Sequence, residues 1–246
     1  MTLRDRWVLV TGAAKRVGRS IALELGARGA NVVVHYNRSQ DEAEATAEDL
    51  RRLGVQALTQ QADLADTGAV RSLAEAAEAA GGSGGVVALV NSASNYLRRP
   101  WEKLDEAVWD ASLDVNLKAP YLLSWSLGRA MSGRGEGTIV NVVDWAAARP
   151  YRHYLPYCVS KAGLLCLTKA LAKELAPNVR VNAVAPGPVL LPEDVDEQEA
   201  EAIRRATVLR RIGEPDDVAR AVRFLIEEAT FSTGALLHVD GGRAVA

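Results

Sequence analysis

Cysteine and histidine are scarce in this chain, and their scarcity argues against two kinds of site. The two cysteines, Cys158 and Cys166, lie eight positions apart in an apolar helical pattern. That spacing is about 12 Å along a helix axis, whereas a disulfide needs Cα atoms within about 7 Å. We therefore expect two unpaired thiols, as in a reducing compartment. The histidines, His35, His153 and His238, show no metal-ligand spacing, so we interpret them as structural or surface residues and predict no metal site.

Net charge and long apolar runs are also lacking. Lys and Arg number 29 against 31 Asp and Glu, which leaves a formal charge of −2 and no electrostatic case for a nucleic-acid or membrane partner. No apolar run approaches the length of a membrane span. The first residues, MTLRDRWVLVTG, enter a strand without the apolar core of a signal peptide. We therefore expect a cytoplasmic protein whose partner is a small molecule.

Strand-like and helix-like segments alternate along most of the chain. Apolar runs predict strands at residues 6–12, 30–36, 55–64, 86–93, 137–143, 179–186 and 235–242. Helical patterns lie between them, and we interpret GGSGG at 81–85 as a surface loop because a strand follows at once. Short apolar strands separated by helices predict a parallel sheet covered on both faces. The predicted fold is a single α/β domain over residues 1–246, a doubly wound parallel sheet.

The first strand ends in a glycine-rich turn, TGAAKRVG, that opens a helix. Gly12 begins the turn, and Gly18 stands six residues later. Strand, glycine turn and helix in that order are typical of a dinucleotide site, where backbone N–H groups and the helix dipole hold a pyrophosphate. Arg16 and Val17 lie within the turn, and Arg16 stands where many such turns have another glycine. The alternative is a turn whose glycines only satisfy backbone angles.

The residues after the second strand predict which dinucleotide binds. In HYNRSQ, Arg38 stands between Asn37 and Ser39, at a place where an acid would bind the ribose of NAD and repel a 2′-phosphate. A guanidinium with amide and hydroxyl donors suits that phosphate. We therefore predict NADPH as the cofactor, with Asp63 and Leu64 beside its adenine. The alternative is that Arg38 is a solvated loop charge.

Residues 141–161, NVVDWAAARPYRHYLPYCVSK, hold the groups suited to proton transfer. Tyr157 and Lys161 are four residues apart in a helical pattern, so they share one helix face. An ammonium near a phenol favours the phenolate, and we expect Lys161 to lower the pKa of Tyr157 toward working pH. Such a tyrosine protonates a substrate atom as hydride arrives from a nicotinamide. A Tyr-x-x-x-Lys pair also occurs by chance in unrelated proteins.

The series of motifs resembles the short-chain dehydrogenase/reductase family over essentially the whole chain. TGAAKRVG, NSAS (91–94), DVNLKAPYLL, YCVSK, APG (185–187) and VDGG follow in that family's order. The resemblance implies a Rossmann-type fold, hydride transfer with NAD(P)(H) and a homotetramer. It implies that Tyr157 is the acid/base, that Lys161 is its partner and that Asn116 supports a proton relay.

The resemblance also implies further contacts. Beyond the turn residues, the cofactor would lie against Asn91, Ser92, Ala93, Tyr157, Lys161, Pro186 and Gly187. Residues 188–210, a charged segment, would form a lid over the substrate.

Two departures from the family pattern resemble its pteridine reductase branch. Most members have serine thirteen residues before the tyrosine, where this chain has Asp144, and glycine where it has Arg16. The branch implies that Asp144 joins the catalytic set and that Ser94 and Tyr96 line a pterin pocket. Trp145, Tyr151 and Tyr154 either wall that flat pocket or make core and subunit contacts. The ending GGRAVA does not match the branch, so the resemblance gives Arg243 no role.

Asp144 bears most directly on the substrate. An ionised carboxylate beside a developing alkoxide costs about 4 kcal/mol at 4 Å and a dielectric constant of 20, which disfavours ketones. A ring C=N needs a proton at nitrogen, and a carboxylic acid kept neutral by burial can donate a hydrogen bond. The alternative is that Asp144 points away and binds a backbone N–H.

We therefore predict an NADPH-dependent reductase of a pteridine-like C=N substrate. The alternatives are a reductase of carbonyls such as 3-oxoacyl thioesters, and a non-catalytic, NADP-binding regulatory protein.

Overall fold

A computed structural model describes residues 1–191 and 195–246. It contains a seven-stranded sheet whose paired strands all run parallel. The strands are β1 (Trp7–Val10), β2 (Asn31–Tyr36), β3 (Ala57–Gln61), β4 (Val86–Asn91), β5 (Gly137–Val142), β6 (Val179–Pro186) and β7 (Leu236–Val239). Their order is β3-β2-β1-β4-β5-β6-β7, so the direction of winding reverses between β1 and β4. Ligands of open α/β sheets bind beyond the carboxyl ends of the strands at such a reversal.

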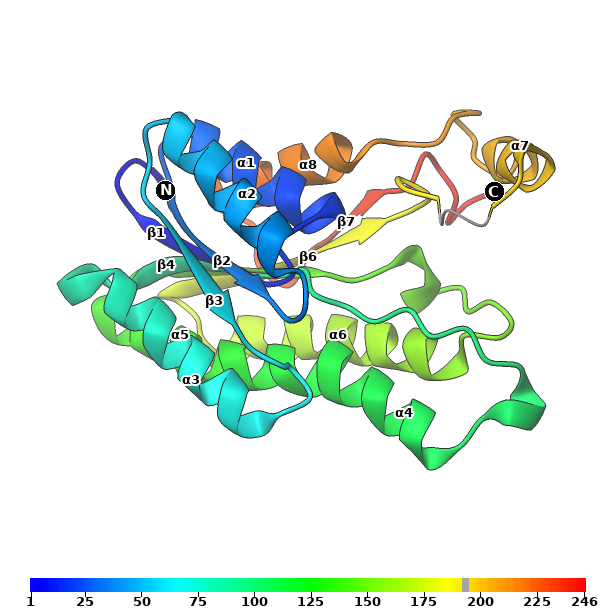
Figure 1. Cartoon of the computed structure of the whole chain (residues 1–246), viewed down its shortest axis with the longest axis horizontal. Coiled ribbons are helices and arrows are strands. Elements are labelled where there is room, and N and C mark those ends of the chain that lie inside the picture. The colour runs from blue at the N-terminus through cyan, green and yellow to red at the C-terminus, as the bar shows by residue number, and fades with distance from the viewer. Residues whose placement is uncertain (192–194) are drawn as a thin grey trace.

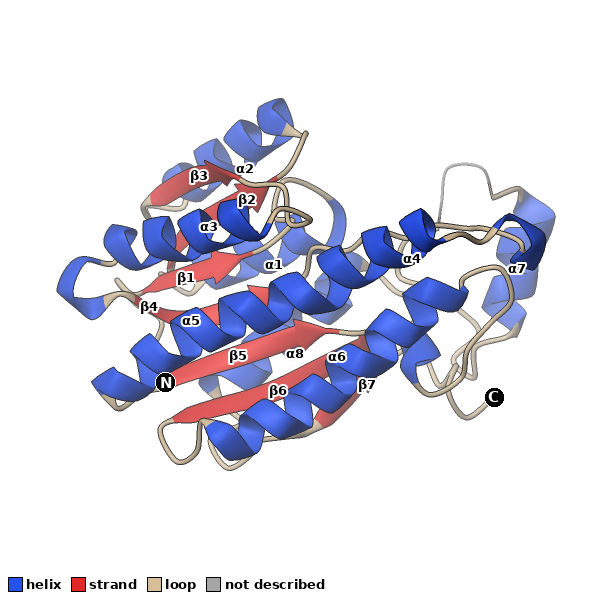
Figure 2. Cartoon of the chain, turned by 90° about the horizontal axis from the view of Figure 1, so that it is seen from below, coloured by secondary structure: helices blue, strands red, loops and turns tan. Residues whose placement is uncertain are grey.

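Helices cover both faces of the sheet (Figures 1 and 2). They are α1 (Arg16–Ala27), α2 (Gln40–Arg52), α3 (Thr67–Ala80), α4 (Glu106–Leu113), α5 (Ala119–Arg134), α6 (Leu155–Glu174), α7 (Glu197–Arg205) and α8 (Pro215–Glu227). One apolar core packs α1, α2 and α8 on one face, and a second packs α3, α5 and α6 on the other. The predicted doubly wound α/β fold is confirmed.

Some predicted boundaries shift for local reasons. The first helix begins at Arg16 rather than near residue 19, because the glycine turn is tighter than the apolar pattern indicates. The helix of the Tyr-Lys pair begins at Leu155 with Pro156 in its first turn, so Tyr157 lies at its start. Residues 82–84 form one 3₁₀ turn at the surface, as expected of a loop. Cys158 is buried and Cys166 exposed, and both thiols are free.

The carboxyl ends of β1, β4 and β5 lie side by side because these strands are neighbours. The glycine turn, the NSAS turn and the segment with Asp144 therefore meet at one edge. Helix α7 and the C-terminal tail lie beyond the ends of β6 and β7 (Figure 1). Among the described residues, no helix combines the length and apolar character that crossing a membrane requires.

Candidate active site

The glycine turn is closely packed against the turn after β4. A Cβ on Gly18 would lie 2.1 Å from the Gly12 carbonyl oxygen, and one on Gly12 would lie 2.9 Å from the Cα of Ala93. The Thr11 hydroxyl accepts hydrogen bonds from the backbone N–H groups of Ser92 and Ala93, each 3.0 Å long. Glycines are therefore required here by space, which contradicts the alternative that they serve backbone angles alone.

A cavity of about 520 Å³ opens beside this turn. It brings together most of the residues predicted for the cofactor: Gly12, Arg16, Val17, Gly18, Asn37, Arg38, Ser39, Asp63, Leu64, Ser92 and Ala93. A glycine cradle, a helix start and an exposed arginine after β2 fit a phosphorylated dinucleotide in chemistry.

Arg16 adopts the left-handed backbone conformation, with φ of +56°. This conformation costs a non-glycine residue about 1–2 kcal/mol, which explains why glycine is common at such a position. The chain retains the turn and gains an exposed guanidinium that faces both the cofactor cavity and its neighbour.

His35 lines the cofactor cavity, a role that goes beyond the structural or surface one expected from its position in the sequence. Its ring is 2% exposed. The Nδ1 atom accepts a hydrogen bond from Gly12 N–H at 3.0 Å, and Nε2 lies 3.1 Å from the carbonyl oxygen of Ala62. Burial lowers the pKa of His35 to about 4, so the ring is neutral with its proton on Nε2. The feature of the sequence that could have identified His35 is its position as a polar residue within the apolar strand NVVVHY.

Asn91 is the one predicted cofactor residue that lines neither this cavity nor its neighbour, among the residues the structure describes. Its amide is buried and donates to Asn141 Oδ1 at 2.8 Å and to the Ser124 hydroxyl at 3.3 Å. Asn91 thus lies at the carboxyl end of β4, with its side chain bonded to β5 and α5, and its contact with the cofactor stays a prediction.

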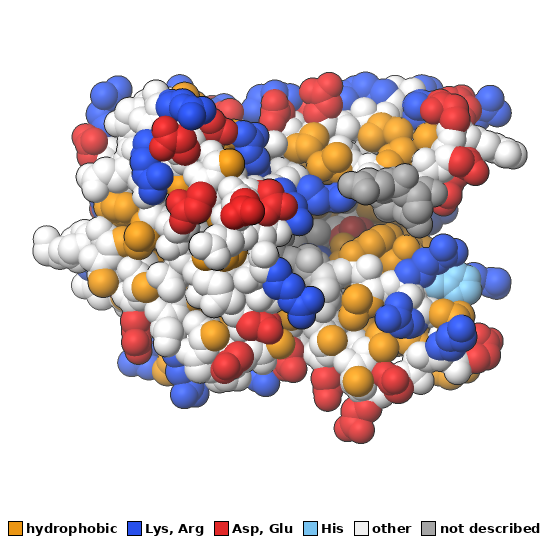
Figure 3. All heavy atoms as spheres, viewed as in Figure 1, with side chains coloured by type: hydrophobic (Ala, Val, Ile, Leu, Met, Phe, Trp, Pro, Cys, Tyr) orange, Lys and Arg blue, Asp and Glu red, His pale blue; other side chains and the backbone are white. Residues whose placement is uncertain are grey.

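A second cavity, of about 620 Å³, adjoins the first, and they share Arg16, Val17, Ser92 and Ser94. It collects the other predicted residues: Tyr96, Asp144, Tyr157, Lys161, Pro186 and Gly187. Figure 3 shows the molecule hollowed between its α7 side and its α4 side, with hydrophobic side chains along the edge of the hollow. A cofactor in the first cavity would therefore end next to the phenol and the carboxyl group.

Asp144 does two things that the sequence presented as alternatives. One carboxylate oxygen accepts the backbone N–H of Ala146 at 2.7 Å, as the capping alternative expects. The other accepts the Tyr157 hydroxyl, also at 2.7 Å. The backbone bond fixes the orientation of the carboxylate, and the second oxygen is thereby held on the phenol.

The prediction that the pKa of Tyr157 is lowered toward working pH is wrong in this structure. Burial and the adjacent Asp144 carboxylate raise the pKa of Tyr157 above its usual value, because a phenolate there would be poorly solvated and would face a like charge. Burial also raises the pKa of Asp144. Tyr157 is therefore a neutral phenol whose proton is donated to a carboxylate.

Lys161 lies beneath this pair. Its Nζ donates to the Val142 carbonyl oxygen at 2.9 Å and lies 5.7 Å from the centroid of the Tyr157 ring. Burial lowers the pKa of Lys161 to about 8, against an opposing contribution from Asp144. An amine with that pKa can both carry and release a proton near neutral pH.

Asn116 lies in a π-helical turn, Asp114–Lys118, between α4 and α5. Its buried side chain accepts from Asn95 N–H at 2.9 Å and donates to the Ser160 hydroxyl at 3.1 Å. It lines neither cavity within the described part of the chain. Its side chain fixes the loop after Ser94 to α6, so its part in a proton relay stays a prediction.

Aromatic rings gather around the phenol. Tyr96 stacks on Tyr154 with centroids 4.2 Å apart and meets Tyr157 edge-on at 4.8 Å. The Trp145 and Tyr151 rings lie 5.4 Å apart. Tyr96, Trp145 and Tyr151 line the second cavity. Tyr154 does not line it, but its ring stacks on that of Tyr96. The wall is suited to a flat ring.

The segment 188–210, predicted as a lid, is described in part, because residues 192–194 lie outside the described residues. Residues 188–191 and Ile203 line the second cavity. Arg243 lines it as well, although no role was predicted for it, because only the fold brings this C-terminal residue to the cavity.

Known proteins resemble this chain along nearly its whole length. The family model described as enoyl-(acyl carrier protein) reductase matches residues 12–244. The 3-oxoacyl-[acyl-carrier-protein] reductase FabG of Staphylococcus epidermidis is 36% identical, over 97% of this chain and 98% of that protein. Dehydrogenase/reductase SDR family member 4 of Homo sapiens is 37% identical, over 98% of this chain and 90% of that protein.

Solved structures agree closely in fold. FolM alternative dihydrofolate reductase 1 from Brucella canis, complexed with NADP, superimposes with a TM-score of 0.92 and 36% identity, covering 100% of this chain and 96% of that one. A blue fluorescent protein from a metagenomic library, in complex with NADPH, gives a TM-score of 0.92 with 30% identity, covering 99% of this chain and 100% of that one.

Proposed function

Because this chain belongs to the short-chain dehydrogenase/reductase family of NAD(P)(H)-dependent oxidoreductases, we propose that it uses NADPH to reduce the C=N bond of a flat, pteridine-like ring. One observation carries the proposal. The Tyr157 hydroxyl is held on the Asp144 carboxylate at 2.7 Å, in a cavity that aromatic rings wall. A likeness to FolM alternative dihydrofolate reductase 1 supports the same substrate class.

Bound NADPH supplies the hydride. The glycine turn and the start of α1 hold its pyrophosphate, and Arg38 with Asn37 and Ser39 receives the 2′-phosphate. Pro186 and Gly187, in the second cavity, border the nicotinamide end.

The chain's own residues supply the proton. As hydride adds to the carbon of C=N, the Tyr157 hydroxyl donates its proton to the nitrogen, so the nitrogen becomes an N–H group and not an anion. The phenolate that remains is reprotonated from the buried Lys161 ammonium. The pKa of Lys161, lowered by burial to about 8, makes its ammonium a proton source near neutral pH.

Asp144 favours nitrogen over oxygen at the reacting position. An ionised carboxylate would repel the alkoxide formed from a ketone by about 4 kcal/mol at 4 Å and a dielectric constant of 20. Reduction of C=N ends in an N–H group, which donates to that same carboxylate. The substrate ring nitrogen thereby gains a partner that a ketone oxygen lacks.

Reduction of a 3-oxoacyl thioester is the second candidate function. The 36% identity to FabG of S. epidermidis favours it. The apolar residues Val189, Leu190 and Leu191 of the second cavity would accept an acyl chain. The non-catalytic alternative loses support, because Tyr157, Asp144 and Lys161 are assembled in one cavity.

Steady-state NADPH oxidation tests the proposal. We expect the wild-type protein to turn over dihydropterin and dihydrofolate faster than an acetoacetyl thioester. Tyr157→Phe, which removes the donated proton, is expected to abolish turnover of both pteridines while NADPH still binds. Activity confined to the thioester would establish the second candidate instead.

We also propose that the protein acts in the cytoplasm and that residues 188–210 cover the bound substrate.

We propose that the protein forms a homotetramer. Helices α5 and α6 lie side by side on one face (Figure 2). Trp125 on α5 is 50% exposed, and Val159 on α6 is 42% exposed. Large exposed apolar side chains favour a subunit contact. Light scattering with size exclusion measures the assembly, and a monomeric mass at micromolar concentration would contradict it.

A further inference from the structure

The Tyr96 ring is held by the segment that begins the helix of the proton donor. It stacks on the ring of Tyr154, with centroids 4.2 Å apart and an angle of 22° between the planes. Tyr154 stands directly before α6, and its carbonyl oxygen accepts the N–H of Cys158 at 2.9 Å. Tyr157 lies in the same first turn of α6. One helical turn therefore holds the proton donor and, through Tyr154, the ring of Tyr96.

A backbone contact joins the same two loops. The N–H of Arg99, in the loop after β4, donates to the carbonyl oxygen of His153 at 2.7 Å. His153 is exposed and has a left-handed backbone conformation, with φ of +69°. That conformation is unfavourable for any residue other than glycine, and it persists where the surrounding contacts fix the chain. The loop of Tyr96 is thus tied to the loop of Tyr154 by its backbone as well as by the two rings.

The Tyr96 ring also remains open to the substrate. It is 47% exposed, lines the second cavity and meets the Tyr157 ring edge-on, with centroids 4.8 Å apart. Tyr154 is not among the described residues that line this cavity. A substrate ring stacked on Tyr96 therefore lies next to the Tyr157 hydroxyl, and Tyr154 acts on that ring through Tyr96.

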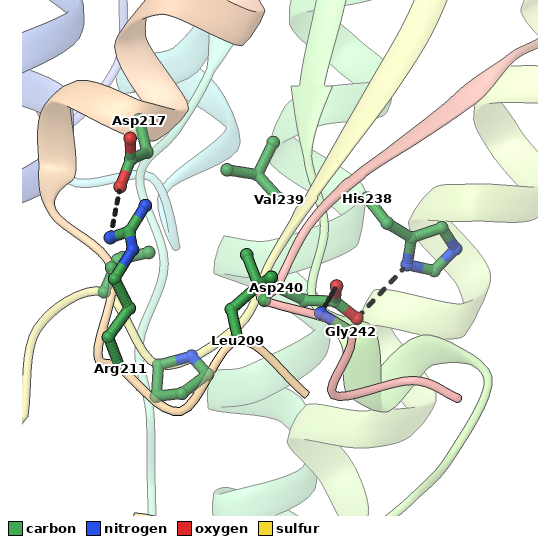
Figure 4. Close-up of a pocket in the computed structure, with 11 residues that line it drawn as sticks. Leu209, Arg211, Asp217, His238, Val239, Asp240 and Gly242 are labelled. Atoms are coloured by element: carbon green, nitrogen blue, oxygen red, sulfur yellow. Dashed lines mark hydrogen bonds and ion pairs between the residues drawn. The ribbon is translucent and has the colours of Figure 1, made fainter. Parts of the chain in front are cut away.

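A third cavity, at the end of β7, has no such wall. It measures about 350 Å³, and Figure 4 shows the side chains of Leu209, Arg211, Asp217, His238 and Asp240 around it. Arg211 forms an ion pair with Asp217 at 3.2 Å, and His238 lies 3.8 Å from Asp240. None of the described residues that line it is a phenylalanine, tyrosine or tryptophan. A flat ring finds its stacking partner in the second cavity and not here.

We propose that Tyr154 is a positioning residue through which the protein selects flat rings. It holds the Tyr96 ring at a fixed place beside Tyr157, so that a ring stacked on Tyr96 presents its C=N nitrogen to the Tyr157 hydroxyl. A flexible acyl chain has no ring to stack, so its reduction gains little from a fixed Tyr96. This inference rests on the proposed function and adds the residue that fixes where the substrate ring lies.

A double-mutant cycle on kcat/KM for dihydropterin tests this role. Tyr154→Leu, which removes the stacking ring, should lower kcat/KM about 3- to 10-fold, the effect that corresponds to one aromatic pair. Tyr154→Phe keeps the ring and should retain the wild-type value. In a protein that already carries Tyr96→Leu, Tyr154→Leu should change kcat/KM less than about twofold, because the ring that Tyr154 holds is absent.

Two further measurements distinguish positioning from a general loss of structure. In Tyr154→Leu, the dissociation constant for NADPH and kcat/KM for an acetoacetyl thioester should both stay within about twofold of wild type. The control variant is Phe231→Leu, which removes a fully exposed aromatic ring from the loop before β7. It should leave kcat/KM for dihydropterin unchanged.

Three results overturn the Tyr154 assignment and leave the proposed function standing. They are an equal effect of Tyr154→Leu with and without Tyr96→Leu, a Tyr154→Phe protein as impaired as Tyr154→Leu, and an equal loss of thioester turnover or NADPH affinity. Failure of the wild-type protein to reduce dihydropterin overturns the proposed function and this inference together.

Discussion

Replacing His35 with asparagine should remove part of the acid sensitivity of the fold. The folded pKa of His35 is lowered from 6.5 to about 4, whereas the unfolded chain has the ordinary value. Between these pH values the unfolded state binds more protons than the folded state, so stability is full above pH 6.5 and falls as pH decreases toward 4. A difference of that size corresponds to about 3 kcal/mol over the window, and about 2 kcal/mol of it is lost by pH 5.

The cause is the pair of bonds that the neutral ring makes. Nδ1 accepts from Gly12 N–H, and Nε2 donates to the Ala62 carbonyl oxygen. A protonated ring would turn an N–H toward the Gly12 N–H and would leave a buried charge unpaired. Asparagine places its side-chain oxygen near the Nδ1 position, so it keeps the bond to Gly12 and does not titrate. Glutamine reaches the Nε2 position and keeps the bond to Ala62 instead.

The assay is urea unfolding of both proteins at pH 7 and pH 5. We expect the wild-type free energy of unfolding to fall by about 2 kcal/mol more than that of His35→Asn. A fluorescence titration with NADPH distinguishes the bond from His35 to Gly12, at the cofactor cavity, from the bond to Ala62. His35→Gln should bind NADPH about tenfold more weakly than His35→Asn, because the Gly12 amide loses its acceptor. Identical pH dependence in wild type and His35→Asn would refute the reasoning.

Two further predictions concern the cofactor cavity. Arg38→Asp should lower kcat/KM for NADPH about 100-fold and spare NADH, because the charge that receives the 2′-phosphate is reversed; a loss shared equally by both cofactors in steady-state assays would contradict the assigned contact. Gly18→Ala should lower the unfolding free energy by about 1–3 kcal/mol, since its Cβ would lie 2.1 Å from the Gly12 oxygen. The control is Gly133→Ala on α5, where an added Cβ would meet nothing within 4 Å. Thermal melting compares the two variants. If Gly18→Ala is no less stable than Gly133→Ala, the prediction that the glycine turn has no room for a Cβ is contradicted.

The sequence was informative where local pattern decides structure. Continuous apolar runs such as NVVVHY predicted buried parallel strands, and the spacing of Tyr157 and Lys161 predicted a shared helix face. The cofactor cavity could also be predicted, because its residues follow closely after β1, β2, β3 and β4 in the chain. These features depend on neighbours in sequence and on one rule of sheet topology.

Tertiary packing decided the rest. The pKa of Tyr157 is raised by its burial and by a carboxylate thirteen residues away in the chain. The spacing of Tyr157 and Lys161 alone predicted that this pKa would be lowered. Asp144 satisfies a backbone amide and the phenol together, which no pattern of letters indicates. Asn91 has the motif position but faces the interior, and Arg243 meets Trp145 only because the tail folds back after Asp240.

The most direct test of the central claim is the substrate preference of Asp144→Ser. Serine restores the donor common in the family and removes the carboxylate that accepts from Tyr157. We expect the ratio of kcat/KM for dihydropterin to that for an acetoacetyl thioester to fall at least about 100-fold, through loss of pteridine turnover and relief of the roughly 4 kcal/mol repulsion of the alkoxide. An unchanged ratio, with NADPH affinity intact, would contradict the claim that Asp144 selects a ring nitrogen over a ketone.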